Sequence, residues 1–193
     1  MEPLMSDQLR IRIKSGILPL FICLIFIGMM LVRVPRSCAQ ETKHREYEVK
    51  AAFIYNFLKF VEWPPKALVN TGSLNICIIG DDPFGDSITA YEGEQVHNKN
   101  ISIIRTSLQG IRNCHVVFIS SSETEYLSHI LNSMRGLNIL SISDTDAFAQ
   151  NGVIINLSIV QQKVRFEINI SAARRAGLNI SSKLLSLAKT VYE

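Results

Sequence analysis

LNICII, at residues 74–79, is a continuous apolar run that is followed at once by the turn sequence GDDP at 80–83. An uninterrupted apolar run of this length predicts a strand that is buried on both faces of a sheet. Similar runs follow at residues 101–106, 115–120 and 138–143, with helices predicted between them at 83–91 and 121–134. Strands and helices in alternation predict an α/β fold with an open, mostly parallel sheet and right-handed crossovers.

Elements of other kinds are predicted on both sides of this region. Residues 153–160 and 163–170 are separated only by two glutamines, which predicts an antiparallel hairpin at one edge on the C-terminal side of the sheet. Short helices are predicted at 171–176 and 183–191. A helix predicted at 45–63 is apolar almost all round, so we expect it to be buried or covered by a partner.

The first 39 residues have the pattern of a secretory signal. Basic residues precede an uncharged run at 17–32, and the small residues Ser37 and Ala39 follow it. We expect cleavage after Ala39, which leaves residues 40–193 as a single exported, periplasmic domain. The alternatives are an uncleaved anchor, for which the run is short, and a lipoprotein attached at Cys38, for which an aliphatic residue at position 35 is missing.

Composition excludes several functional classes. Hydrophobic residues make up 47% of the chain, enough for a buried core, so a wholly disordered protein is excluded. The formal charge of +3 lies entirely in residues 1–39, which carry five basic and two acidic side chains. Residues 40–193 are therefore neutral, and we expect no nucleic-acid partner, because binding to phosphates needs clustered cations.

Two cysteines, Cys77 and Cys114, lie beyond the predicted cleavage site. An even pair of cysteines in an oxidising compartment predicts a disulfide. This bridge would close a loop of about 37 residues and contribute about 4 kcal/mol in the chain-entropy model. Two buried free thiols are the alternative. The spacing suits no zinc site.

No arrangement of side chains typical of an enzyme is apparent. The loop at 80–87 lacks the Lys of a phosphate-binding loop, and its three carboxylates would repel a phosphate. The sequence has no G-x-S-x-G segment, and its four histidines have no catalytic or metal-binding spacing. Asp144 and Asp146 are interpreted as part of a solvated loop. We therefore expect no enzyme activity, cofactor or metal, and favour a binding or regulatory role.

Several segments together resemble the YfiR family. They lie at residues 49–64 (ending in KFVEWP), 77–85, 114–119, 152–157, 164–169 (VRFEIN) and 172–178 (AARRAGL), with Ser181, Ser182, Leu184 and Leu185. The resemblance covers about residues 47–191. KFVEWP and the run from RFEIN through AARRAGL to the paired serines are its most specific parts.

The resemblance implies a periplasmic protein that binds the sensor region of an inner-membrane diguanylate cyclase and represses it, which lowers cyclic di-GMP. It also implies an outer-membrane lipoprotein that sequesters the repressor, and a possible homodimer. Cys77 and Cys114 match a disulfide of the family. A second bridge, known in some members, is not possible, because residues 40–193 contain no other cysteine.

Four residues are candidate contacts with a protein partner: Ile155, Glu167, Arg174 and Arg175. The reason is that an edge hairpin with large apolar and charged side chains offers a surface for pairing with another protein. A purely structural role for these residues is the alternative. The alternative function is a periplasmic module that binds a small molecule, since open α/β sheets hold ligands at the carboxyl ends of their strands.

Overall fold

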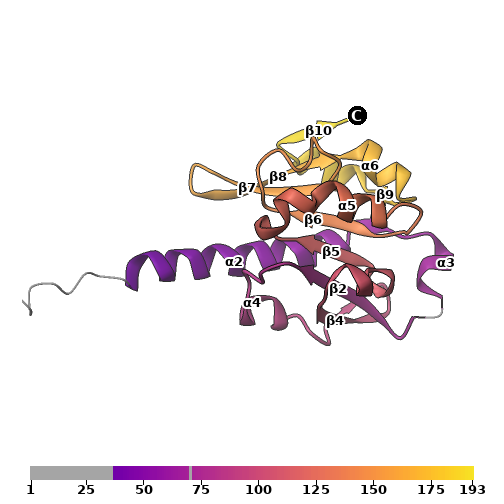
Figure 1. Ribbon diagram of the computed structural model, residues 1–193, viewed down its shortest axis with the longest axis horizontal. Helices are drawn as coiled ribbons and strands as arrows, with labels where there is room; N and C mark the ends of the chain where they lie inside the picture. The colour runs from indigo at the N-terminus through magenta and orange to yellow at the C-terminus, as the bar shows by residue number, and fades with distance from the viewer. Residues whose placement is uncertain (1–36, 70) are drawn as a thin grey trace, which may run out of the picture. The chain divides into compact units, whose positions relative to one another are not determined.

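A central sheet organises the computed structural model, which describes residues 37–69 and 71–193 (Figure 1). The strands are β1 (Val61–Glu62), β2 (Ser73–Ile79), β3 (Gln95–Val96), β4 (Lys99–Arg105), β5 (Val116–Ile119), β6 (Leu140–Ser143), β7 (Ile155–Val160), β8 (Lys163–Asn169), β9 (Asn179–Ile180) and β10 (Thr190–Tyr192). The α-helices and 3₁₀-helices are α2 (Ser37–Leu58), α3 (Pro65–Leu68), α4 (Asp86–Thr89), η1 (Leu108–Asn113), η2 (Ser121–Tyr126), α5 (Leu127–Ser133), α6 (Ile170–Arg175) and α7 (Ser182–Leu187). The apolar run of the predicted signal lies outside the described residues, and cleavage after Ala39 stays a prediction.

Within the described residues, eight strands form one sheet in the order β10-β8-β7-β6-β5-β2-β4-β3, and β1 pairs with β9 in a separate ribbon. The strands β4, β2, β5, β6 and β7 run parallel to one another. β8 returns antiparallel to β7. The predicted α/β fold, with its mostly parallel sheet and its hairpin on the C-terminal side, is confirmed.

Apolar side chains cover both faces of the sheet. On one face α2 packs against the hairpin, where the rings of Phe57 and Phe166 lie 4.9 Å apart between centroids. On the other face η1 and α5 contribute Ile111, Leu127 and Ile130 to a second apolar cluster. Strands covered on both faces have no polar side to alternate with. This is why β2 and β5 could be predicted from apolar runs.

The helix predicted at 45–63 ends earlier in the structure, at Leu58. Beyond a short turn, Val61 and Glu62 pair with Ile180 and Asn179 as β1 and β9. The apolar character of this segment therefore continues into a strand. None of the helices in the ranges 37–69 and 71–193 combines the length and apolar character that a membrane crossing needs.

The sequence predicted that the C-terminal hairpin forms one edge of the sheet, but in the structure it does not. β10 lies outside the hairpin and pairs in parallel with β8. Just before β10, the Lys189 N–H donates a hydrogen bond of 2.8 Å to the carbonyl oxygen of Phe166. The helix predicted at 183–191 accordingly ends at Leu187. The helix predicted at 83–91 shortens to α4, because the Asp82 side chain turns the chain by accepting a hydrogen bond from the Phe84 N–H.

Candidate functional site

Ile155, a candidate partner contact, does not reach the surface. Its side chain is 0% exposed and belongs to the apolar cluster beneath α2. The whole run from residue 153 to residue 157 is buried, because β7 is an inner strand flanked by β6 and β8. The prediction for Ile155 is therefore wrong. A continuous apolar run in the sequence was the available signal of an inner strand.

Glu167 lies on β8, but β10 covers most of it. The side chain is 14% exposed. Lys189 Nζ lies 3.3 Å from Oε1, and the Tyr192 hydroxyl donates a hydrogen bond to Oε2 at 3.2 Å. These contacts tie β10 to the sheet, so Glu167 has an internal role that the sequence did not indicate.

Arg174 and Arg175 are exposed at the C-terminal end of α6, which Asn169 begins by accepting a hydrogen bond from the Ala172 N–H. Neither arginine forms an ion pair with any residue of the described part of the chain. Both are therefore accessible to a partner. The structure separates them from Ile155 by burial and from Glu167 by the contacts of β10, so the four predicted residues do not form one surface.

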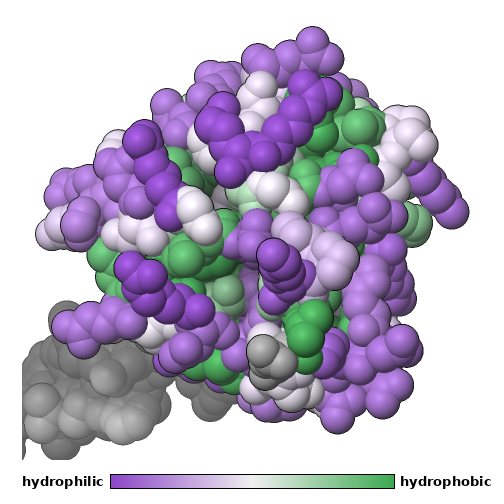
Figure 2. Space-filling model, turned by 90° about the vertical axis from the view of Figure 1, so that its right-hand side faces the viewer, coloured by the Kyte–Doolittle hydropathy of each residue, from purple (hydrophilic) through white to green (hydrophobic). Residues whose placement is uncertain are grey.

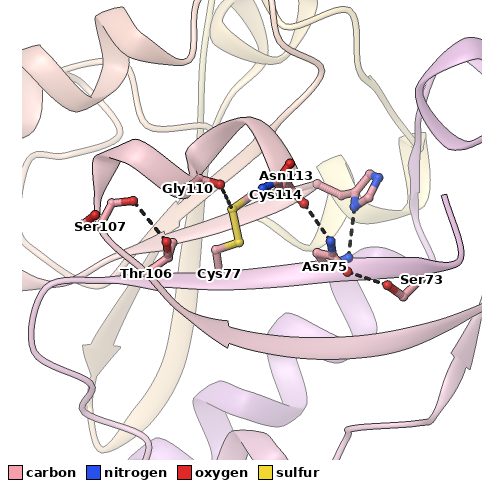
Figure 3. Close-up of a disulfide and its surroundings, with 9 residues drawn as sticks. Ser73, Asn75, Cys77, Thr106, Ser107, Gly110, Asn113 and Cys114 are labelled. Carbon is pink, nitrogen blue, oxygen red and sulfur yellow. Dashed lines mark hydrogen bonds between the residues drawn. A yellow bond between two sulfur atoms is a disulfide. The ribbon is translucent and has the colours of Figure 1, made fainter. Parts of the chain in front are cut away.

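The predicted disulfide joins Cys77 of β2 to Cys114, just before β5 (Figure 3). Both sulfur-bearing residues are buried between the sheet and η1. Beside it, the Asn75 N–H donates a hydrogen bond to Nδ1 of His115 at 3.0 Å, so the ring proton lies on Nε2. Burial lowers the pKa of His115, which favours the neutral ring. The bridge joins the middle of β2 to the segment that leads into β5.

A buried ionic cluster lies where β6 ends. Lys50 of α2 is almost fully buried and contacts the carboxylates of Glu46 and Asp144, with Nζ 2.7 Å from Asp144 Oδ2. The Tyr47 hydroxyl donates a hydrogen bond to the same Oδ2 at 2.8 Å. Burial, and then the negative charge of Asp144, raise the pKa of Tyr47 far above its ordinary value. The cluster holds α2 against the carboxyl end of the sheet.

The interpretation of Asp144 as a solvated residue is wrong, because its side chain is only 7% exposed. Asp146 is exposed, as expected. The sequence signal for the cluster was Lys50 itself, a single charge inside an apolar helical segment and one turn after Glu46. No group of His, Cys, Asp or Glu side chains among residues 37–69 and 71–193 is arranged to hold a metal ion.

The crevice in which α/β sheets usually bind ligands is narrowed by the protein's own side chains. It lies between the carboxyl ends of β2 and β5, whose following segments cross to opposite faces of the sheet. There Ser122 accepts a hydrogen bond from the Asp81 N–H at 3.0 Å. A Cβ atom at Gly80 would overlap the Ser122 hydroxyl and lie 2.8 Å from Glu123 Cγ. A cavity of about 310 Å³ remains beside these contacts, with Ile79, Gly80 and Glu123 in its lining. The small-molecule site expected at this end of the sheet therefore stays a prediction.

An apolar patch lies between α2 and the hairpin. It consists of the exposed residues Val49 and Ile159 and the half-buried residues Phe53 and Val164. Phe53 contacts Phe166, with 6.1 Å between ring centroids, and Val49 lies one helical turn earlier on the same side of α2. Ile159 pairs with Val164 on the sheet face that also carries Phe166.

The patch lies at the free end of both elements. Figure 1 shows α2 passing below the hairpin, and both extend in the same direction past the carboxyl ends of the neighbouring strands. Val49 and Ile159 are 45% and 46% exposed. Large apolar side chains that are clustered and exposed in this way are typical of protein-binding surfaces. The sequence predicted that the helix at 45–63 is buried or covered by a partner, and this patch is where a partner would cover α2.

The sequence profile of the YfiR/HmsC-like family matches residues 47–189. The chain belongs to this family. The resemblance inferred from the sequence is thereby confirmed.

One solved structure supports the fold of this YfiR/HmsC-like protein. A conserved domain protein from Vibrio cholerae O1 biovar eltor strain N16961 is similar with a TM-score of 0.52 and 12% sequence identity, over 75% of this chain and 60% of that one. The chain thus spans about three fifths of the length of that protein. An ABC domain in complex with L-Trp from Streptococcus pneumonia is similar at a TM-score of 0.44 and 13% identity, over 66% of this chain and 57% of that one.

Proposed function

We propose that the protein is a periplasmic regulator that binds the sensor region of an inner-membrane diguanylate cyclase and represses the enzyme. Repression lowers the intracellular concentration of cyclic di-GMP. An outer-membrane lipoprotein would compete for the regulator, sequester it and so release the cyclase.

The observation that carries the proposal is the family match over residues 47–189, which covers every strand of the sheet except β10 and all flanking helices except the first part of α2. The disulfide between Cys77 and Cys114 supports an oxidising compartment such as the periplasm, because disulfides rarely persist in the cytosol. A neutral domain with an exposed apolar patch is also suited to contact with another protein.

The α2–hairpin patch is the surface that we assign to the cyclase. Its four apolar side chains come from two elements that share a core, since Phe53 and Phe57 both contact Phe166. The patch is therefore held rigid, which reduces the entropy lost on binding. This assignment replaces the one based on Ile155 and Glu167, which are occupied within the fold.

The test measures cyclic di-GMP in the native host, comparing wild type, a deletion strain, and the deletion strain complemented with variants. We expect a rise on deletion that the wild-type gene reverses. Ile159→Glu should fail to reverse it, because a carboxylate at the centre of an apolar contact must be desolvated without a partner.

Val69→Glu is the matched control. Like Ile159, Val69 is an exposed β-branched apolar residue, but it follows α3 at the amino ends of the strands. It should complement as well as the wild type. An unchanged cyclic di-GMP concentration on deletion would refute the repressor role, whereas failure of both variants or of neither would refute the assigned surface.

A further inference from the structure

A cleft of about 530 Å³ opens at the amino ends of β6 and β7, between the C-terminal ends of α5 and α6. Its apolar lining comes from both helices and from the sheet, and includes Leu131, Met134, Ile139, Ile154, Ala172 and Ala176. Arg135 follows α5 and Arg175 ends α6, and both exposed side chains line the cleft. Figure 2 shows this end of the molecule, where apolar side chains are visible between hydrophilic ones.

The two guanidinium groups have no anionic partner within the described part of the chain. Neither Arg135 nor Arg175 takes part in an ion pair there, and no carboxylate lines the cleft. A second cleft of about 460 Å³ adjoins the first at Gly136 and Ile139, and it adds Arg112, again without a carboxylate. No carboxylate that lines either cleft therefore neutralises the positive charge of these arginines.

Acidic residues predominate at one end of the sheet. The segments at the carboxyl ends of the parallel strands carry Asp81, Asp82, Asp86, Glu123, Glu125, Asp144 and Asp146, and the cations beside them, Arg105 and Lys50, pair with Asp82 and Asp144. The segments at the amino ends carry Lys66, Arg112, Arg135, Arg174 and Arg175. Residues 40–193 are neutral overall, so the basic end does not reflect an excess of cations in the domain. It arises because the fold gathers basic side chains at the amino ends of the strands.

Stabilisation of the helix ends explains part of this pattern, but not the cleft. A cation at a helix C-terminus offsets the helix dipole. Arg174 and Arg175 both lie in the last turn of α6, yet only Arg175 lines the cleft. Offsetting the helix dipole does not require an apolar floor between the two unpaired guanidinium groups. It matches a ligand that has both an apolar body and a negative charge.

We infer that this cleft binds a small organic carboxylate with an apolar body. The carboxylate lies between Arg135 and Arg175, whose planar guanidinium groups match a carboxylate with paired N–H donors. The apolar body lies on the floor formed by Met134, Ile139 and Ala172. A volume of this size is typical of small-molecule sites. The site lies at the opposite end of the strands from the α2–hairpin patch and does not depend on the proposed cyclase contact.

The test uses the purified protein and three probes that differ only in their head group. They are 4-phenylbutyrate, 4-phenylbutanol and 4-phenylbutylamine, and binding is measured by calorimetry and by NMR. We expect saturable binding of the acid, binding of the alcohol that is weaker by about tenfold or more, and no binding of the amine. Raising the salt concentration should weaken the binding of the acid and leave the binding of the alcohol unchanged.

Two single variants separate the site from general surface charge. Arg175→Gln should weaken binding of the acid by about tenfold, and Arg174→Gln, which removes the same charge one residue away, should not. Arg135→Gln should act like Arg175→Gln. All three residues are exposed, so the variants should keep the melting temperature of the wild type.

Three outcomes would overturn the inference. The first is that neither 4-phenylbutyrate nor octanoate, as a second carboxylate, binds at roughly 5 mM. The second is that the acid and the alcohol bind equally. The third is that Arg174→Gln weakens binding as much as Arg175→Gln, which would indicate a diffuse charge effect. Each of these results leaves the cyclic di-GMP experiment unaffected.

Discussion

Lys50 shows how one side chain joins parts of the chain that are distant in sequence. Its ammonium group lies between Glu46, one turn earlier on α2, and Asp144, which follows β6. Burying the charges of Lys50 and Asp144 costs desolvation energy, which their mutual attraction and the hydrogen bond from Tyr47 offset. The cluster adds little net stability compared with apolar packing. Its effect is to define where α2 lies on the sheet.

Removing only the cation should therefore be costly. In Lys50→Met, the carboxylate of Asp144 keeps its hydrogen bond from Tyr47 but loses its cation, and we expect the free energy of unfolding to fall by about 3 kcal/mol. Urea denaturation measures the loss. Lys43→Met is the control, because Lys43 is an exposed lysine of the same helix and should change stability by less than about 0.5 kcal/mol. Equal losses in the two variants would contradict the role given to the cluster.

At the scale of the element, the β7–β8 hairpin has an unusual turn. Gln161 and Gln162 both have positive φ, at 50° and 60°. A two-residue hairpin loop favours this backbone, because it matches the twist of the strands, but the conformation suits Asn and Gly rather than a residue with a long side chain. The hairpin that presents Ile159 and Val164 is thus formed in spite of its turn residues, through the packing of its strands.

Replacing the turn with better-suited residues should stabilise the protein. We expect Gln161→Asn combined with Gln162→Gly to raise the free energy of unfolding by about 1 kcal/mol, because the strain at positive φ is relieved. Chemical denaturation is the measurement. The double alanine variant keeps the unfavourable φ and should give no gain. If alanines stabilise equally, the glutamine side chains and not the backbone would be the cause.

Elements differ in how much of them the sequence could predict. β2 and β5 could be predicted because strands buried on both faces are apolar throughout. β1, β9 and β10 could not, because each is two or three residues long and exists only through its pairing with a distant segment. The disulfide could be predicted because residues 40–193 hold only two cysteines. Arg135 and Arg175 line one cleft only because α5 and α6 both end near the amino ends of β6 and β7, which no local pattern records.

At the scale of the whole domain, the disulfide connects a large part of the fold. It closes a segment that contains α4, β3, β4 and η1. Removing it with Cys77→Ser should destabilise the protein by about 4 kcal/mol, mainly because the unfolded chain gains freedom. For a domain of this size we expect the melting temperature to fall by about 10 °C.

Calorimetry with and without a reductant checks this prediction. Reduction of the wild type should reproduce the shift of Cys77→Ser, and the variant should show no further change. An unchanged melting temperature in the variant would refute a stabilising bridge.

The position of the bridge also bears on the order in which the chain assembles. Cys77 and Cys114 join β2 to the start of β5, whereas β4, which lies between them in sequence, pairs with the opposite edge of β2. Closing the covalent ring therefore leaves the docking edge of β4 open. A chain oxidised early, when only β2 and β5 have met, can still add β3 and β4 from outside. Early and late oxidation lead by different routes to the same sheet.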